Sequence, residues 1–306
     1  MRGGENMQII KRALFILPIL LVCAGLCAGT AQAKIRKGSW KKNIRWSYDT
    51  RKKELVVWGQ GEMAEIEHTD EDTISPGWIF YDEARKVRIK EGITKISGYT
   101  FFEFRNMTCL ELPDTLREIG NSAFWDTPKL KKVRLPASLE VMGKGAFKCS
   151  GLREVRIPGG VKKISQDAFF FCEHLKKVIL EEGVEETDPH PFWGSRRLSV
   201  VKLPRSLRRI GPSSFLDTGL RKVTIPENVE EIGAGAFEAV DPKKATLKRV
   251  VIKSKKIRKW GKGIFDDARR DLVIEVPANK EKEYRKSLKK KGLPKYVKII
   301  GKRALD

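Results

Sequence analysis

The sequence predicts a mainly β fold in which about eight short repeats stack into a solenoid. Three segments share one pattern: residues 130–147 read LKKVRLPASLEVMGKGAF, residues 152–169 read LREVRIPGGVKKISQDAF and residues 220–237 read LRKVTIPENVEEIGAGAF. The interval between units is also nearly constant, at 22 to 27 residues. Self-similarity at such a period is the signature of a repeat architecture. The units begin at Ala84, Met107, Leu130, Leu152, Leu175, Leu198, Leu220, Leu247 and, less clearly, Leu272.

Each repeat predicts two short strands and a turn. The opening Leu-x-x-Val-x-Ile alternates apolar and variable residues at its end, as a strand with one buried face requires. The proline that follows has no N–H to donate, so it marks the end of the hydrogen bonding between neighbouring strands. A second apolar segment such as residues 161–164 comes next, then a Gly or Ser, then an Ala-Phe pair such as Ala146-Phe147. One unit cannot bury these faces alone, so the units stack around a continuous core.

The shared pattern L-x-x-V-x-[IL]-P-x-x-[LV]-x-x-[IM]-[GS]-x-x-A-F resembles the BspA-like leucine-rich repeats of bacterial surface and secreted proteins, over about residues 84–300. The resemblance implies a leucine-rich-repeat solenoid that interacts at the cell surface, without naming a partner. It also implies a small or Cys residue three positions after the Phe, which Thr127, Cys172 and Thr218 match. We interpret Cys149 and Cys172 as buried ladder positions, and a disulfide between them stays open.

Both ends of the array are expected to form caps. Residues 44–61 suggest a β-hairpin that turns near residues 49–53. At the other end, the sequence reads as a strand near residue 276, a short helix over 281–288 and a last strand over 295–300. The side chains expected to close the first coil are Trp46, Tyr48, Leu55, Val57 and Trp58. The predicted organisation is a signal peptide (1–33), an N-terminal capping segment (34–83), the solenoid (84–275) and a C-terminal cap (276–306).

The first 33 residues indicate export. Lys11 and Arg12 precede an apolar run over residues 13–24, and small residues then lead to Ala31-Gln32-Ala33. This order describes a secretory signal peptide cleaved near Ala33. The run is shorter than the roughly 20 residues that cross a bilayer, and no second long apolar stretch follows. A retained signal anchor is the alternative. We expect a secreted or surface-associated protein with no membrane span in the mature chain.

The chain is strongly basic, with 62 Lys and Arg against 39 Asp and Glu, a formal net charge of +23. Without residues 1–33, 59 basic and 38 acidic residues remain, a net charge of +21. Such a charge favours anionic partners.

The basic excess maps to one face of the predicted repeats. The variable positions of the opening segment number 24, of which 15 are basic and two acidic; the second segment has 16, of which eight are basic and six acidic. The opening strands should point their variable residues outward from a concave sheet, so we predict an electropositive ligand-binding face there. Its candidate residues are Arg85, Lys86, Arg88, Lys131, Lys132, Arg134, Arg153, Arg156, Lys176, Lys177, Lys202, Arg221, Lys222, Lys248 and Arg249. A solvated face that only keeps the protein soluble is the alternative.

The sequence nominates no catalytic group, cofactor or metal site. The three histidines, His68, His174 and His190, do not pair with Cys or Glu at metal-ligand spacing. His190 lies in a repeat where Thr-Asp-Pro-His-Pro-Phe replaces the usual turn. This segment predicts either a protruding contact loop or a tolerated irregularity. Three Cys remain after residue 33, an odd number that argues against a disulfide framework.

We therefore expect a monomeric, non-enzymatic binding or adhesion protein whose basic face takes a protein, glycan or polyanionic partner such as a cell-wall polymer. Sequence-specific nucleic-acid binding is not expected, because no nucleic-acid module is visible and aromatic residues are not interleaved with the basic positions. The alternative is a structural envelope protein that charge alone retains on anionic wall polymers, without a specific ligand.

Overall fold

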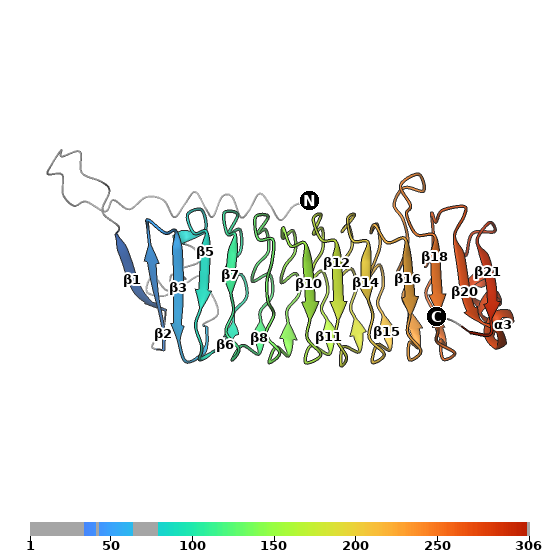
Figure 1. Ribbon diagram of the computed structural model, residues 1–306, viewed down its shortest axis with the longest axis horizontal. Coiled ribbons are helices and arrows are strands. Elements are labelled where there is room, and N and C mark those ends of the chain that lie inside the picture. Colours follow the sequence, from blue (N-terminus) through green and yellow to red (C-terminus); the bar gives the residue numbers. More distant parts are fainter. Residues whose placement is uncertain (1–33, 41–42, 64–78, 305–306) are drawn as a thin grey trace. The chain divides into compact units, whose positions relative to one another are not determined.

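A computed structural model of the chain describes residues 34–40, 43–63 and 79–304. The predicted signal peptide lies outside these residues. The described part is a parallel β-solenoid, as the sequence predicts, in which successive coils lie side by side (Figure 1).

The opening segments of the repeats form the first strand set, which is interrupted twice along the array. Its strands pair in parallel with their neighbours in the same register, so equivalent residues of successive coils lie next to each other. The strands are β5 (Lys86–Ile89), β7 (Cys109–Glu111), β10 (Glu154–Ile157), β12 (Lys177–Leu180), β14 (Val200–Lys202), β16 (Lys222–Ile225), β18 (Arg249–Ile252) and β20 (Val273–Pro277).

The second segments form a second strand set of shorter parallel strands. Most of them are two residues long, because a glycine or small residue turns the chain directly after the buried apolar side chain. The strands are β4 (Gly61–Glu62), β6 (Ile93–Ile96), β8 (Glu118–Ile119), β9 (Val141–Met142), β11 (Lys163–Ile164), β13 (Glu186–Thr187), β15 (Arg209–Ile210), β17 (Glu231–Ile232) and β19 (Lys259–Trp260).

A continuous core runs between the two strand sets. The pattern's Leu, Val and Ile positions are almost all buried, as Leu152, Val155 and Ile157 illustrate. The Phe of each unit stacks on the Phe of the next, with ring centroids 5.2 to 5.8 Å apart from Phe101 to Phe265. Each coil therefore covers the apolar faces of its neighbours, as repeat stacking requires.

The N-terminal cap is a three-stranded antiparallel meander: β1 (Ile35–Trp40), β2 (Ile44–Asp49) and β3 (Glu54–Gly59). The predicted hairpin corresponds to β2 and β3, and β3 then pairs in parallel with β5. Tyr48 is buried and stacks on Phe80 with centroids 4.1 Å apart. Burial and the neighbouring Glu83 raise the pKa of Tyr48 to about 12. Trp58 is only half-buried, because successive side chains of a strand face opposite ways and Val57 takes the inward position.

The C-terminal cap replaces a second segment with a helix. After β20 come a 3₁₀ turn (η2, Ala278–Lys280), the helix α3 (Glu281–Lys290) and a last strand, β21 (Lys298–Lys302), which pairs in parallel with β20. Helix α3 buries Tyr284 and Leu288. Glu281 accepts a hydrogen bond from the Gly301 N–H at 3.0 Å, and Arg285 donates one to the Ile299 carbonyl at 2.5 Å. These side chains satisfy backbone groups at the edge of the last strand.

The structure corrects the interpretation of Cys149. Three residues after four successive core Phe residues, a buried position holds Thr127, Ser150, Cys172 and Ser195. Each is hydrogen-bonded to the carbonyl of a core Phe or, for Ser150, to the Cys172 thiol. Cys149 lies one residue earlier, is half-buried and has a φ of 55°. The unit that begins at Leu130 is one residue shorter than its neighbours, and Ser150 rather than Cys149 occupies the buried position three residues after the Phe. Both Cys149 and Cys172 are free thiols.

Candidate binding surface on the first strand set

The register of the first strand set places the variable residues in two outward columns. Glu154 lies beside Lys177 and then Val200, while Arg156 lies beside Ile179 and then Lys202. The intervening Val155 and Val178 point into the core. This alternation is the ordinary consequence of strand geometry, and it brings side chains of successive coils within reach of each other.

Five of the 15 candidate cations are held in ion pairs. Most of their partners lie outside the variable positions of the opening segment. Because these acids come from neighbouring coils and from the cap, the repeat pattern gave no signal for them. The pairs are Arg88 with Glu54 (3.2 Å) and Glu111 (3.0 Å), Arg134 with Asp114 (2.8 Å), Arg156 with Glu181 (3.0 Å), Lys177 with Glu154 (3.3 Å) and Arg249 with Glu275 (2.8 Å). The Asp114 hydrogen bond raises the pKa of Arg134.

The other ten candidate cations are exposed and form no ion pair with any residue that the structure describes. They keep their full charge available to a ligand, whereas an ion pair must be broken or shared before its cation can bind. These ten are Arg85, Lys86, Lys131, Lys132, Arg153, Lys176, Lys202, Arg221, Lys222 and Lys248.

Six of these ten occupy the same repeat position and form a row that we name the basic rim: Arg85, Lys131, Arg153, Lys176, Arg221 and Lys248. Nearly all directly precede the first residue of a strand. Backbone hydrogen bonds hold neighbouring coils together at this level: the Arg153 N–H donates to Lys131 at 3.0 Å and the Lys176 N–H to Arg153 at 2.8 Å. Adjacent strands lie about 4.8 Å apart, so rim charges on directly neighbouring coils, as in the run Lys131, Arg153 and Lys176, fall within the roughly 8 Å screening length at physiological salt.

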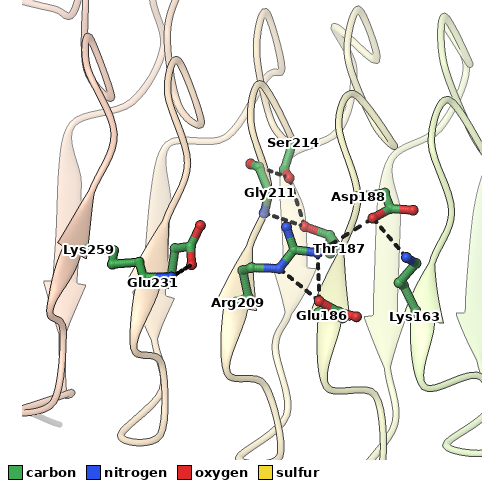
Figure 2. Close-up of polar contacts among 9 residues, drawn as sticks. All are labelled: Lys163, Glu186, Thr187, Asp188, Arg209, Gly211, Ser214, Glu231 and Lys259. Atoms are coloured by element: carbon green, nitrogen blue, oxygen red, sulfur yellow. Dashed lines mark hydrogen bonds and ion pairs between the residues drawn. The ribbon is translucent and has the colours of Figure 1, made fainter.

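The second strand set shows the opposite arrangement. Its equivalent positions alternate in sign across five consecutive strands, in the order Lys163, Glu186, Arg209, Glu231 and Lys259. Figure 2 shows the result: Arg209 contacts Glu186 at 2.6 Å, Lys259 contacts Glu231 at 3.4 Å and Lys163 contacts Asp188 at 3.2 Å. A neighbouring column alternates in the same way, in the order Lys162, Glu185, Arg208, Glu230 and Arg258. Of the cations in these two columns, all but Lys162 contact a carboxylate, whereas the cations of the basic rim form no ion pair with a described residue.

The irregular repeat around His190 keeps the path of a regular coil. Phe192 takes its place in the Phe stack, and the N–H groups of His190 and Phe192 donate to the next coil at 3.0 and 3.2 Å. Thr187 replaces the usual buried Ile. Its hydroxyl accepts the Gly211 N–H at 2.8 Å and lies 2.8 Å from the Ser214 hydroxyl, as Figure 2 shows. The segment is an irregular sequence in a regular coil and does not form a protruding loop.

In the described part of the chain, possible metal ligands do not gather at one place. Across residues 34–40, 43–63 and 79–304, no three His, Cys, Asp or Glu side chains are arranged to hold a metal ion. Burial raises the pKa of the Cys172 thiol to about 12 and also raises that of Cys149.

A family model described as a BspA-type leucine-rich repeat region matches the chain in six copies, over residues 73–199, 149–271 and 188–305. The chain belongs to this family. The basic rim lies at variable positions of the repeat pattern.

Solved structures share the BspA-type fold. A leucine-rich-repeat protein from Eubacterium ventriosum has 18% identity and a TM-score of 0.55, over 80% of this chain and 73% of that chain. One from Bacteroides ovatus has 18% identity and a TM-score of 0.50, over 77% and 70%. At such identities the likeness shows the fold alone.

No curated protein matches this BspA-type chain. Within the part of the chain that the structure describes, no helix is both long and apolar enough to cross a membrane.

Proposed function

We propose that the protein is a secreted or surface-associated, non-enzymatic binding protein that takes an anionic polymer along the basic rim and the neighbouring lysines of the first strand set. One observation carries this proposal: ten exposed cations on this side have no ion pair among the described residues, while the cations of the second strand set alternate with carboxylates. Like charges facing each other across strands are destabilising, so an uncompensated row favours binding of an anionic ligand.

The geometry favours an extended ligand. The rim offers one cation in most successive coils, and the distance between neighbouring rim positions follows the spacing of the strands. A polymer with regularly placed carboxylate, sulfate or phosphate groups can contact several coils at once, and each contact adds to the affinity. Binding by such a row should depend strongly on salt and should not read a nucleotide sequence.

Export is part of the proposal and follows from residues 1–33, whose order predicts cleavage near Ala33. The family points to a role in binding or adhesion. A mass measurement of the exported protein tests the cleavage, because a retained leader would add the mass of residues 1–33.

The decisive experiment measures binding of the protein to heparin, polyglutamate, duplex DNA and neutral dextran across a salt series. A rim variant carries Lys131→Gln, Arg153→Gln and Lys176→Gln. A matched control carries Lys162→Gln, Arg208→Gln and Arg258→Gln, which removes the same charge from the second strand set. Three exposed contacts of about 0.5 kcal/mol each amount to about tenfold in affinity, so the rim variant should weaken polyanion binding by about that factor. The control should change it far less.

The rival function is charge-driven retention on an anionic envelope without a specific ligand. It predicts weak binding to every polyanion, no saturation, and equal small losses in both variants. That outcome would remove the basic rim as a site.

A further inference from the structure

A second surface feature lies on the turn that follows each core Phe. The next residue along the chain is aromatic in four of five consecutive coils and lysine in the other. We name this row, Phe102, Trp125, Lys148, Phe170 and Trp193, the aromatic ridge. All five side chains are half-buried, so part of each reaches the surface.

The members of the aromatic ridge contact each other in sequence from coil to coil. The rings of Phe102 and Trp125 lie 4.9 Å apart, and those of Phe170 and Trp193 lie 5.2 Å apart. Lys148 bridges the gap between them, with its Nζ 4.8 Å from the ring of Trp125 and 4.8 Å from that of Phe170. The result is a row of aromatic rings, bridged in its middle coil by the Lys148 side chain, that advances by one coil per residue.

The fold does not demand aromatic residues at this position. The core already has its own Phe stack, and in two later coils the equivalent positions hold the half-exposed acids Glu238 and Asp266. Aromatic side chains that stay partly exposed in successive coils, without a packing reason, are candidates for an interaction site. The ridge is therefore a feature of the surface rather than a requirement of coil stacking.

Polar groups gather at the C-terminal end of the aromatic ridge. The His190 ring lies 5.1 Å from the Trp193 ring, and its Nδ1 is 3.4 Å from Oδ1 of Asp167. Gln166 donates to the other carboxylate oxygen of Asp167 at 3.3 Å. Asp167 Oδ1 is buried, yet no donor of the described residues makes a hydrogen bond to it. Oδ1 is closed to solvent with His190 beside it, but the Asp167 side chain as a whole is 25% exposed. Its other carboxylate oxygen can therefore accept from a ligand with hydroxyl groups that lies on the aromatic rings.

We propose that the aromatic ridge binds a linear polysaccharide, with sugar rings against Trp125, Phe170 and Trp193 and a hydroxyl donating to Asp167. A sugar ring presents weakly positive C–H groups on its faces, which the negative face of an aromatic ring attracts, and hydroxyl groups around its rim. An extended glycan repeats along one direction, as the ridge does. This binding is independent of the basic rim, because it uses no row of unpaired cations.

The test measures binding of uncharged β-1,4-linked hexasaccharides of glucose, N-acetylglucosamine, mannose and xylose to the full protein, by titration calorimetry and tryptophan fluorescence. At least one sugar should bind, with an affinity that does not fall as salt is raised. Trp193→Ala should weaken that binding by tenfold or more, and Asp167→Asn by several-fold. Trp58→Ala is the matched control, since Trp58 is also half-buried but lies in the N-terminal cap.

Thermal unfolding of each variant separates loss of the site from loss of the fold, and Asp167→Asn keeps the shape of the side chain if Trp193→Ala unfolds. Failure of all four sugars to bind, or equal losses in Trp58→Ala, overturns the proposal. Salt dependence keeps the two sites distinguishable, because failure here leaves polyanion binding by the basic rim untouched, and the reverse also holds.

Discussion

At the scale of single residues, charge pairing depends on which coil supplies the carboxylate. Glu275 on β20 illustrates this, because its carboxylate forms ion pairs with Arg249 from β18 at 2.8 Å and with Lys302 from β21 at 2.9 Å. Its side chain is only 9% exposed. The hydrogen bond from Arg249, followed by that from Lys302, lowers the pKa of Glu275 despite the opposing effect of burial. The pattern placed Arg249 on the outer face, but its partner lies on β20, in the irregular unit that begins at Leu272, and could not be read from the repeat pattern.

This lowered pKa predicts an acid-sensitive C-terminal cap. A carboxylate with a depressed folded-state pKa contributes stability above its unfolded pKa, and that contribution is lost as the pH falls through the folded value. Glu275→Gln should therefore lower the free energy of unfolding at pH 7 but have little effect once the pH is well below about 4. Denaturant unfolding of both proteins from pH 3 to 7 measures the difference. A constant difference over that range would contradict the assigned role.

At the scale of the elements, the interruptions of the first strand set follow the shorter repeats. The units that begin at Leu130 and Leu198 have 22 residues, and pairing stops between β7 and β10 and between β14 and β16. Residues 131–135 form no assigned strand. Each short unit ends in a glycine, Gly151 or Gly219, that packs against the carbonyl of the preceding coil. The sequence predicted a strand in every unit, because the repeat pattern does not record how a coil that is one residue shorter pairs with its neighbours.

Gly151 should tolerate no larger side chain. A Cβ at this position would lie 1.9 Å from the Pro128 carbonyl oxygen, so the backbone would have to move. Gly151→Ala should lower the stability by about 1–3 kcal/mol, the usual cost of overpacking. Gly98→Ala is the control, since its Cβ would come no closer than 3.1 Å to the Asn121 carbonyl oxygen. Denaturant midpoints compare the two, and an unchanged midpoint for Gly151→Ala would show that the short loop can relax.

At the scale of the described solenoid, three surface features could be predicted from the sequence to different degrees. The basic excess on the first strand set could be predicted, because the repeat fixes which positions face outward. The alternation of cations and carboxylates along the second strand set could not be predicted without the register between coils, which the structure supplies. The aromatic ridge was missed because its residues follow the core Phe, outside the repeat pattern. The signal in the sequence is the aromatic residue after Phe101, Phe124, Phe169 and Phe192.

The most direct test of the central claim is lysine footprinting of the protein with and without heparin, in which acetylation rates are read by mass spectrometry. Binding along the basic rim predicts that Lys131, Lys176 and Lys248 react several-fold more slowly in the complex. Lys162 and Lys259 on the second strand set should react at unchanged rates. Equal protection of both groups would contradict the account, because it would mean that the polymer adsorbs to the protein without a defined face.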